Sequence, residues 1–197
     1  MILSFRYKIK FEVYQKIQDH NWIDRHVISI LFAMVHEQTI LIQQINPTDR
    51  VWVEDLCVQR WGSNRVVTRG ALHIVTELPG FVAWESGERL GLLTYHMFRE
   101  EFEIVTLDSL ESNLGVGSAL ISEAVRCAQS YNCRRIWLIT TNDNTPALRF
   151  YQKRGFIIAA FHRDAVKDSR IIKPEIPLTG IDGIPIKDEI ELECLLN

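Results

Sequence analysis

The fold of this 197-residue chain is decided by one segment, NTPALRFYQKRGF at residues 144–156. Asn144 can cap the start of a helix, and Gly155 is typical of the residue that ends one. A continuous apolar run at residues 136–139 precedes the segment, as expected for a strand buried on both faces. A further apolar strand is predicted over residues 156–161. This alternation of strands and a helix indicates an α/β domain.

A second informative segment is LDSLESNLGVGSAL at residues 107–120. A predicted strand runs here into a Gly-x-Gly turn that opens a helix, whose apolar face extends to Ser130. Glycines allow the backbone to approach a ligand closely, and a helix start presents unpaired N–H groups to an anion. We therefore predict a phosphate or pyrophosphate site at residues 113–118. Tight packing is the alternative explanation for such glycines.

Two other phosphate-binding motifs are excluded. The Rossmann fingerprint requires a third glycine, and Leu120 stands at that position. The P-loop requires Gly-Lys-Ser/Thr after four intervening residues, and the chain contains no such run. These exclusions also argue against a generic nucleotide-binding protein.

An antiparallel meander is predicted upstream of these two segments. Strands are expected over residues 81–84, 90–98 and 102–107, and Ser86–Gly87 is a hairpin signal between the first two. Further along the chain, residues 189–195 alternate apolar and acidic side chains and form the last predicted strand. The chain therefore combines an antiparallel meander with a parallel α/β unit.

In order and spacing these segments resemble the GNAT superfamily of N-acetyltransferases. In that family an Asn-x-x-Ala-x-x-x-Tyr-x-x-x-Gly-Phe run follows the Gly-x-Gly helix and one buried strand. The resemblance covers residues 81–161 closely and residues 51–197 more loosely. It implies an α/β fold (an α+β mixed sheet) of the acyl-CoA N-acyltransferase type, in which the meander is followed by a βαβαβ unit with a splayed pair of strands.

The resemblance implies acetyl-CoA as co-substrate and no metal. Backbone amides of residues 113–118 would hold the pyrophosphate, residues 107–109 would pair with the pantetheine amides, and Asn144 would bond to the pantetheine arm. The implied cofactor residues are Leu107, Asp108, Ser109, Asn113, Leu114, Gly115, Val116, Gly117, Ser118, Asn144, Ala147 and Tyr151. Ser112 departs from the Arg or Gln usual in the family, which removes a side-chain phosphate contact and leaves the backbone cradle.

Two catalytic residues are predicted, because acetyl transfer to an amine requires a base for the ammonium and an acid for the departing thiolate. Glu103 is the predicted base, directly or through water, and the Glu-Ile-Val sequence resembles family members that use a glutamate. An exposed strand carboxylate is the alternative. Tyr151 is the predicted acid, and a core aromatic is the alternative. The backbone N–H near Ser109 could polarise the thioester carbonyl.

Charge and composition exclude several other classes. The formal net charge of −3 provides no basic field for nucleic acid, and the basic pairs at residues 134–135 and 153–154 are expected to be solvated ends of elements. The longest apolar run, residues 27–35, is too short to span a membrane, and no signal-peptide cleavage site follows it. Four scattered cysteines form no Cys-x-x-Cys pair, which suits a reducing cytoplasm.

Histidines provide no zinc motif. His36–Glu37 begins an H-E-x-x-H pattern, but Ile40 replaces the second histidine. His73 and His96 are expected near the cleft and could touch substrate, with ordinary surface histidines as the alternative.

Two parts are expected along the chain: an N-terminal extension at residues 1–46, helical or partly disordered, and an acetyltransferase domain at residues 47–197. Met34 is an alternative translation start, and the extension could mediate a homodimer. The predicted activity is N-acetyl transfer in a ternary complex to a small-molecule or peptide amine, which the sequence does not identify. The loop at residues 173–187, whose acids could attract a cationic amine, is expected on the acceptor side. A non-catalytic acyl-CoA-binding sensor is the alternative function.

Overall fold

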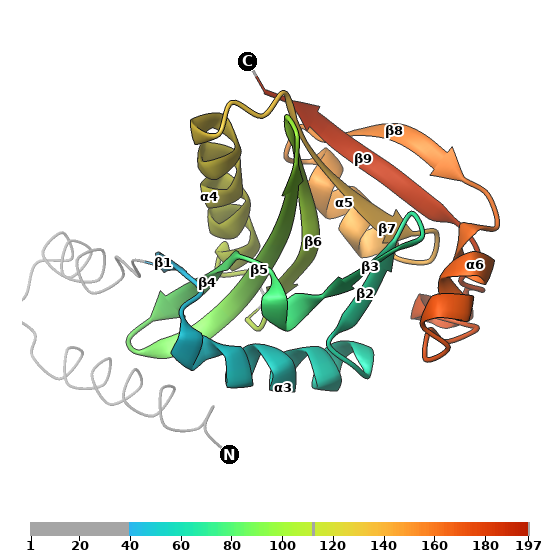
Figure 1. Cartoon of the computed structure of the whole chain (residues 1–197), viewed down its shortest axis with the longest axis horizontal. Coiled ribbons are helices and arrows are strands. Elements are labelled where there is room, and N and C mark those ends of the chain that lie inside the picture. Colours follow the sequence, from blue (N-terminus) through green and yellow to red (C-terminus); the bar gives the residue numbers. More distant parts are fainter. Residues whose placement is uncertain (1–39, 112, 197) are drawn as a thin grey trace, which may run out of the picture. The chain divides into compact units, whose positions relative to one another are not determined.

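The computed structural model describes residues 40–111 and 113–196 (Figure 1). Most of the expected extension, with Met34, lies outside these residues. The extension expected to be helical or partly disordered does not reach residue 46, because Leu41–Gln44 forms strand β1, antiparallel to β4 (Gly80–Glu85). Ile40 and Ile42 alternate onto the main core, which is the period of a strand. The compact unit accordingly begins at Ile40.

The described residues form one seven-stranded mixed sheet in the order β1-β4-β5-β6-β7-β9-β8. The predicted meander is confirmed, since β4, β5 and β6 are sequentially antiparallel. Ser86 and Gly87 both have positive φ in the first hairpin, as a tight turn of this kind requires. The remaining strands are β5 (Glu88–Phe98), β6 (Glu101–Ser109), β7 (Arg135–Thr141), β8 (Ile157–His162) and β9 (Glu189–Leu195).

The predicted splay lies between β6 and β7. The two strands run parallel and pair only where residues 101–104 face residues 135–138. Beyond that point β6 continues to Ser109 and β7 to Thr141 without pairing to each other. Strand β9 lies between β7 and β8 and is antiparallel to both. The sheet is therefore open in its middle, at the carboxyl ends of two parallel strands.

Helices cover both faces of the sheet. The predicted helices are confirmed as α4 (Val116–Ser130) and α5 (Thr145–Gln152). A further helix, α3 (Arg50–Trp61), follows a capping box at Asn46 and ends at Gly62, which lies in the left-handed region.

Besides strand β1, two elements were not predicted from the sequence. One is the hairpin of β2 (Arg65–Thr68) and β3 (Ala71–Ile74), which forms a separate two-stranded sheet. The other is α6 (Ala165–Ile172), whose N-cap residue Asp164 makes no side-chain capping bond. A helix without a cap bond has little local signal. Short 3₁₀ turns occur at residues 47–49, 75–77 and 181–183.

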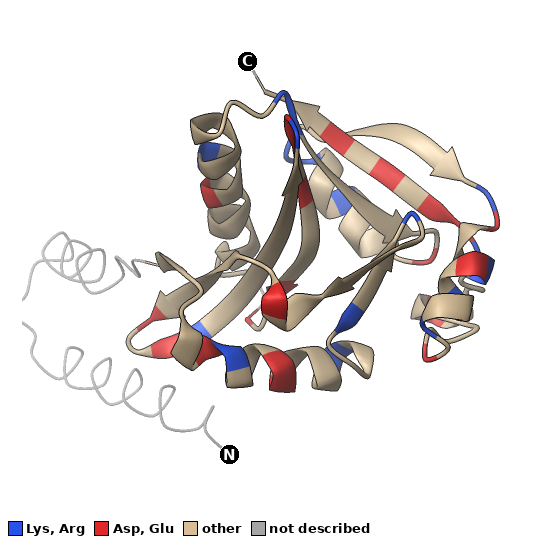
Figure 2. Cartoon of the chain, viewed as in Figure 1, with Lys and Arg blue, Asp and Glu red and all other residues tan. Residues whose placement is uncertain are grey.

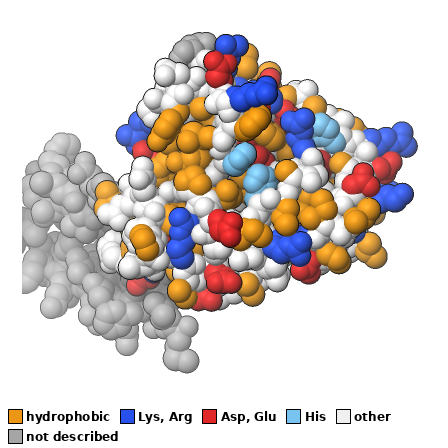
Figure 3. All heavy atoms as spheres, viewed as in Figure 1, with side chains coloured by type: hydrophobic (Ala, Val, Ile, Leu, Met, Phe, Trp, Pro, Cys, Tyr) orange, Lys and Arg blue, Asp and Glu red, His pale blue; other side chains and the backbone are white. Residues whose placement is uncertain are grey.

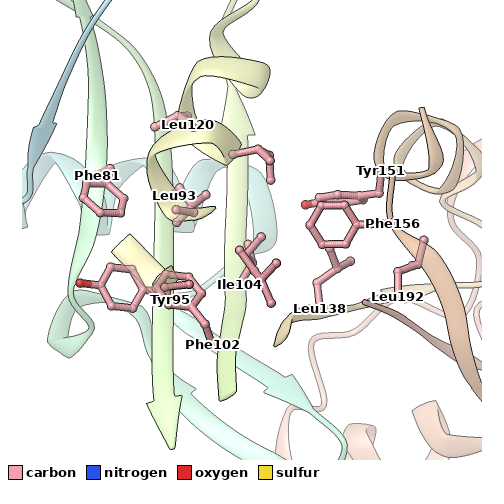
Figure 4. Packing of buried hydrophobic residues seen from close by; sticks show 14 of the residues in the cluster. Phe81, Leu93, Tyr95, Phe102, Ile104, Leu120, Leu138, Tyr151, Phe156 and Leu192 are labelled. Atoms are coloured by element: carbon pink, nitrogen blue, oxygen red, sulfur yellow. The ribbon is translucent and has the colours of Figure 1, made fainter. Parts of the chain in front are cut away.

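Two apolar clusters hold the sheet between these layers. The larger joins the meander to α4 and α5 through residues such as Phe102, Ile104 and Leu120 (Figure 4). The smaller lies on the opposite face, where Val82 and Leu92 meet α3. Because side chains alternate along a strand, Phe102 and Ile104 point into the larger cluster and Glu103 points to the other face.

Candidate active site

A cavity of ≈ 960 Å³ opens where β6 and β7 diverge. Its walls are the ends of these strands, the start of α5, the end of α3, strand β2, and α6 with the loop that follows it. Four predicted cofactor residues line it: Leu107, Asn144, Ala147 and Tyr151. The other predicted cofactor residues lie at the end of β6, in the loop after it and at the start of α4. The splay therefore creates a space large enough for a substrate.

The glycine turn at the start of α4 has features of both a phosphate site and tight packing, the two explanations given for it from the sequence. Asn113 and Gly115 have φ of 64° and 80°, so the loop bends through the left-handed region before the helix begins at Val116. A Cβ on Gly117 would lie 2.9 Å from the Phe150 ring, so close packing requires this glycine. Gly115 is the N-cap residue of α4, and it has no side chain that could accept a hydrogen bond from the first N–H groups of the helix. Without such a side-chain cap, the start of the helix is suited to an anion.

Arg154 was not predicted as a site residue, because the basic pair at residues 153–154 was expected to be the solvated end of a helix or strand. Its guanidinium donates to Oγ of Ser118 over 3.1 Å and 2.5 Å and lies 3.5 Å from the centre of the Phe150 ring. It is half-buried and adds a positive charge beside the first turn of α4. The spacing of Phe150 and Arg154, four residues apart, was the available signal.

Tyr151 is both a core residue and a cavity residue. Its ring packs edge-on against Phe150 and Phe156, with centroids 5.1 Å and 5.4 Å away. Figure 4 shows its hydroxyl pointing toward the strand that carries Ile104. Burial, reinforced by the negative charge of Asp108, raises the pKa of Tyr151 well above its ordinary value. The phenol therefore keeps its proton at neutral pH and can act as a proton donor.

Asn144 and Asp108 also lie at the splay, and their polar groups make different contacts. Oδ1 of Asn144 accepts from the backbone N–H of Ala147 over 3.2 Å and so caps α5, as predicted. Asp108 lies near Arg60, with Oδ1 and Nε 3.7 Å apart, while its Oδ2 is buried without a hydrogen-bond partner among the described residues. Burial raises the pKa of Asp108.

Glu103 is not the exposed carboxylate that was the alternative to catalysis, because its exposed fraction is 5%. The hydroxyl of Thr68 donates to its Oε1 over 2.6 Å, and Nε2 of His73 lies 3.0 Å from the same hydroxyl. Burial raises the pKa of Glu103 despite the opposing hydrogen bond from Thr68, and burial together with His96 lowers the pKa of His73. The pKa of Glu103 and the pKa of His73 are therefore closer together than in the free amino acids.

Glu103 lines a second, smaller cavity of ≈ 290 Å³ and not the larger one. His73 and His96, expected near the cleft, both lie in this smaller cavity with it. Figure 3 shows histidine side chains reaching the surface in the middle of this face. Thr68 lines both cavities, so its hydroxyl connects the predicted base with the larger space.

An acidic row along β9 completes the surroundings (Figure 2). Glu189 lines the larger cavity, where its carboxylate accepts from Oγ of Ser169 and from the backbone N–H of Arg69. Glu191 and Glu193 both bond to Arg135 at 2.8 Å. The sequence showed these acids as alternating strand residues but gave no sign that Glu189 reaches the cavity.

The loop at residues 173–187, predicted to lie on the acceptor side, lines the larger cavity, and the acids in and beside it make different contacts. Glu175 lines the larger cavity, whereas Asp188 accepts from the backbone N–H of Asp164. Lys173 is buried at the cavity wall and donates to the carbonyl of Arg65 over 2.6 Å. The loop therefore lines the larger cavity and, through Lys173, is held to the backbone of β2.

A splayed parallel strand pair, with a glycine turn and a tyrosine helix beside it, is the arrangement that the resemblance to acyl-CoA-dependent N-acyltransferases implied. The chain belongs to the acetyltransferase (GNAT) family, whose sequence model matches residues 50–156. None of the helices formed by the described residues is long and apolar enough to cross a membrane.

The chain is also similar in sequence to a curated relative and in fold to solved structures. The uncharacterized protein YdhI of Bacillus subtilis (strain 168) is 43% identical over 137 residues, which are 69% of this chain and 86% of YdhI. A GNAT family acetyltransferase from Elizabethkingia anophelis with acetyl-CoA bound is similar in structure, with a TM-score of 0.60 and 20% identity over 81% of this chain and 100% of that one. A Bacillus subtilis acetyltransferase in complex with CoA has a TM-score of 0.59, with the same identity and coverage.

Proposed function

We propose that this chain transfers an acetyl group from acetyl-CoA to a primary amine, directly and within a ternary complex. The observation that carries the proposal is the ≈ 960 Å³ cavity at the splay, which brings Leu107, Asn144, Ala147 and Tyr151 together from separate elements. One cavity lined by the cofactor residues on one side and by the acceptor loop on the other suits two substrates held at once.

Acetyl-CoA would be held by backbone more than by side chains. On the side of β7, β6 has no strand partner beyond Ile104 within the described part of the chain, so its N–H and C=O groups there could pair with the pantetheine amides as an added strand would. The uncapped start of α4 would receive the pyrophosphate. Arg154 would supply the positive charge that Ser112 does not.

In the proposed reaction, Glu103 accepts a proton from the amine. The hydroxyl of Thr68 passes its own proton to Oε1 of Glu103 and takes one from the ammonium in the larger cavity, or from a water beside it. The free amine attacks the thioester carbonyl, the C–S bond breaks, and Tyr151 donates its proton to the departing sulfur. The new amide nitrogen loses its extra proton, which returns to the Tyr151 oxygen through water, and Glu103 releases its proton to solvent. The backbone N–H near Ser109 stabilises the developing oxyanion.

The acceptor is proposed to be a cationic amine, a small molecule or a peptide. Glu189 and Glu175 line the larger cavity and give it negative charge close to the acceptor loop. A charged ammonium would be attracted to them before it loses its proton.

Calorimetric titration of the full chain with acetyl-CoA, followed by thiol-release assays across an amine library, tests this proposal. We expect binding and amine-dependent thiol release. Binding without release with any amine would instead support an acyl-CoA-binding module. No binding at millimolar acetyl-CoA would refute the proposed function.

A further inference from the structure

His73, His96 and Glu103 come from three strands and meet at one point. His73 is on β3, His96 is on β5, and Glu103 on β6 is the cross-strand partner of His96. Their potential ligand atoms all lie within 4.8 Å of one another. Oε2 of Glu103 is 3.6 Å from Nε2 of His73 and 3.9 Å from Nδ1 of His96. One carboxylate oxygen therefore faces two imidazole nitrogens.

These separations approach those of a metal site. Ligand nitrogens and oxygens lie about 2.0–2.2 Å from Zn²⁺, so neighbouring ligand atoms in a tetrahedral site are about 3.4 Å apart. Small side-chain rotations would close the observed gaps. His96 is 45% exposed and opens the cluster to solvent, whereas Glu103 and His73 are buried. An ion could therefore enter from the solvent beside His96, and the two buried side chains would hold it in place.

Support for the ligands is already present. Thr68 donates to Oε1 of Glu103 and leaves Oε2 for the ion, which is how an outer-shell partner orients a ligand carboxylate. Without an ion, Nε2 of His73 donates to the Thr68 hydroxyl, because that hydroxyl gives its own proton to Glu103; binding an ion through Nε2 would break this hydrogen bond and move the ring proton to Nδ1. A hydrogen-bonded cluster without any ion would account for Thr68 and His73, whereas an ion would also engage His96, whose Nδ1 lies 3.9 Å from Oε2 of Glu103.

We propose that His73, His96 and Glu103 bind a divalent transition-metal ion, and specifically Zn²⁺. Two imidazole nitrogens and one carboxylate suit zinc, whereas Ca²⁺ and Mg²⁺ prefer oxygen ligands. Resting on the proposed function, an ion on Oε2 would withdraw charge from the Glu103 carboxylate and make its Oε1 a weaker proton acceptor, so it would stop transfer without blocking acetyl-CoA in the larger cavity. Zinc would then act as an inhibitor of the acetyltransferase.

Direct binding tests the site independently of activity. Chelator-treated full chain is titrated with Zn²⁺ by calorimetry, and Co²⁺ is added as a spectroscopic probe whose absorption distinguishes nitrogen and oxygen ligands from cysteine thiolates. We expect one zinc ion per chain, and His96→Gln and His73→Gln should each weaken binding at least about tenfold. His162→Gln is the matched control, because His162 pairs with Glu191 at 3.4 Å without a second histidine.

The outcomes separate the hypotheses. No zinc binding at submillimolar concentration, or stoichiometric binding unchanged by both substitutions, overturns the metal site, and a thiolate spectrum moves the ion to the cysteines. Circular dichroism verifies that each variant folds. Zinc binding without detectable acetyl transfer would retain the site and count against the proposed function alone, whereas transfer that zinc inhibits in wild type but not in His96→Gln supports both.

Discussion

The larger and smaller cavities are built in different ways. The larger cavity lies beside segments that are continuous in sequence, the glycine turn and α5, and local patterns were enough to find them. The smaller cavity is assembled from β3, β5 and β6 with Thr68 of β2, and its polar residues are far apart in the chain. The contrast suggests that binding of the co-substrate is encoded locally, whereas the proton chemistry depends on the fold as a whole.

The largest expected effect lies in the smaller cavity. Glu103→Gln should lower kcat/KM at neutral pH by on the order of 10²-fold or more, because the amide cannot accept the proton. Acetyl-CoA affinity should hardly change, since Glu103 does not line the larger cavity. Glu101→Gln, on the same face of β6, is the control.

The pH dependence sharpens the same test. The base must be deprotonated, so wild-type kcat/KM should rise with pH through a pKa above the ordinary 4.5 of Glu103. That rising limb should vanish in Glu103→Gln. A variant with the wild-type profile would remove Glu103 from the mechanism.

A comparable effect is expected in the larger cavity. Tyr151→Phe removes the proton donor and keeps the ring, so turnover should fall about 10²-fold while calorimetric acetyl-CoA affinity stays nearly constant. Tyr95→Phe is the matched control, because Tyr95 is equally buried but lines neither cavity. An unaltered turnover in Tyr151→Phe would leave this residue with a packing role only.

Arg154 should have a smaller effect, and on affinity. Arg154→Gln should raise the Kd for acetyl-CoA about tenfold, because a charge-assisted hydrogen bond contributes about 1.5–3 kcal/mol. Its neighbour Lys153 is exposed, and Lys153→Gln should change the Kd little. If both variants lost the same affinity, the contribution would be a general surface charge, which added salt would screen.

The smallest effect concerns Asp108, at the end of β6. Its folded-state pKa is raised by burial, so its contribution to stability is present below the ordinary value of 3.8 and is lost as pH rises through the folded pKa. Asp108→Asn should therefore increase the free energy of unfolding at neutral pH by about 1 kcal/mol. Urea unfolding between pH 4 and 7 measures this, and a loss of stability at pH 7 would show that the ion pair with Arg60 outweighs the cost of burying the Asp108 carboxylate.

Much of the fold could be predicted because the decisive signals are local. The glycine turn, the Asn144 cap and the hairpin at Ser86–Gly87 each act within a few residues. Strand β1 was missed because Ile40, Leu41 and Ile45 fit a helical period as well as a strand, and only pairing to β4 distinguishes the two. The hairpin of β2 and β3, and α6, gain their stability from neighbours in space.

The candidate site divides along the same line. Tyr151 and Asn144 were predicted because they belong to one motif, and Glu103 was predicted from its short Glu-Ile-Val sequence; their roles stay predictions. Its burial and its meeting with Thr68 depend on a hairpin that lies over the sheet. Arg154 shows that a basic pair in sequence can hold residues of different kinds, since one side chain is exposed and the other packs on Phe150.

The position of β9 bears on the order in which the molecule can form. This strand follows every other strand of the sheet in sequence, yet it separates β7 from β8 and carries Glu189 to the larger cavity. During synthesis, the meander, α4 and β7 can fold while later residues are still being added. Strand β8 must wait for β9 before it can join the sheet. The larger cavity is therefore completed late in folding. A nascent chain that ends before β9 should form the β6 and α4 side of the cavity but not the side that contains Glu189.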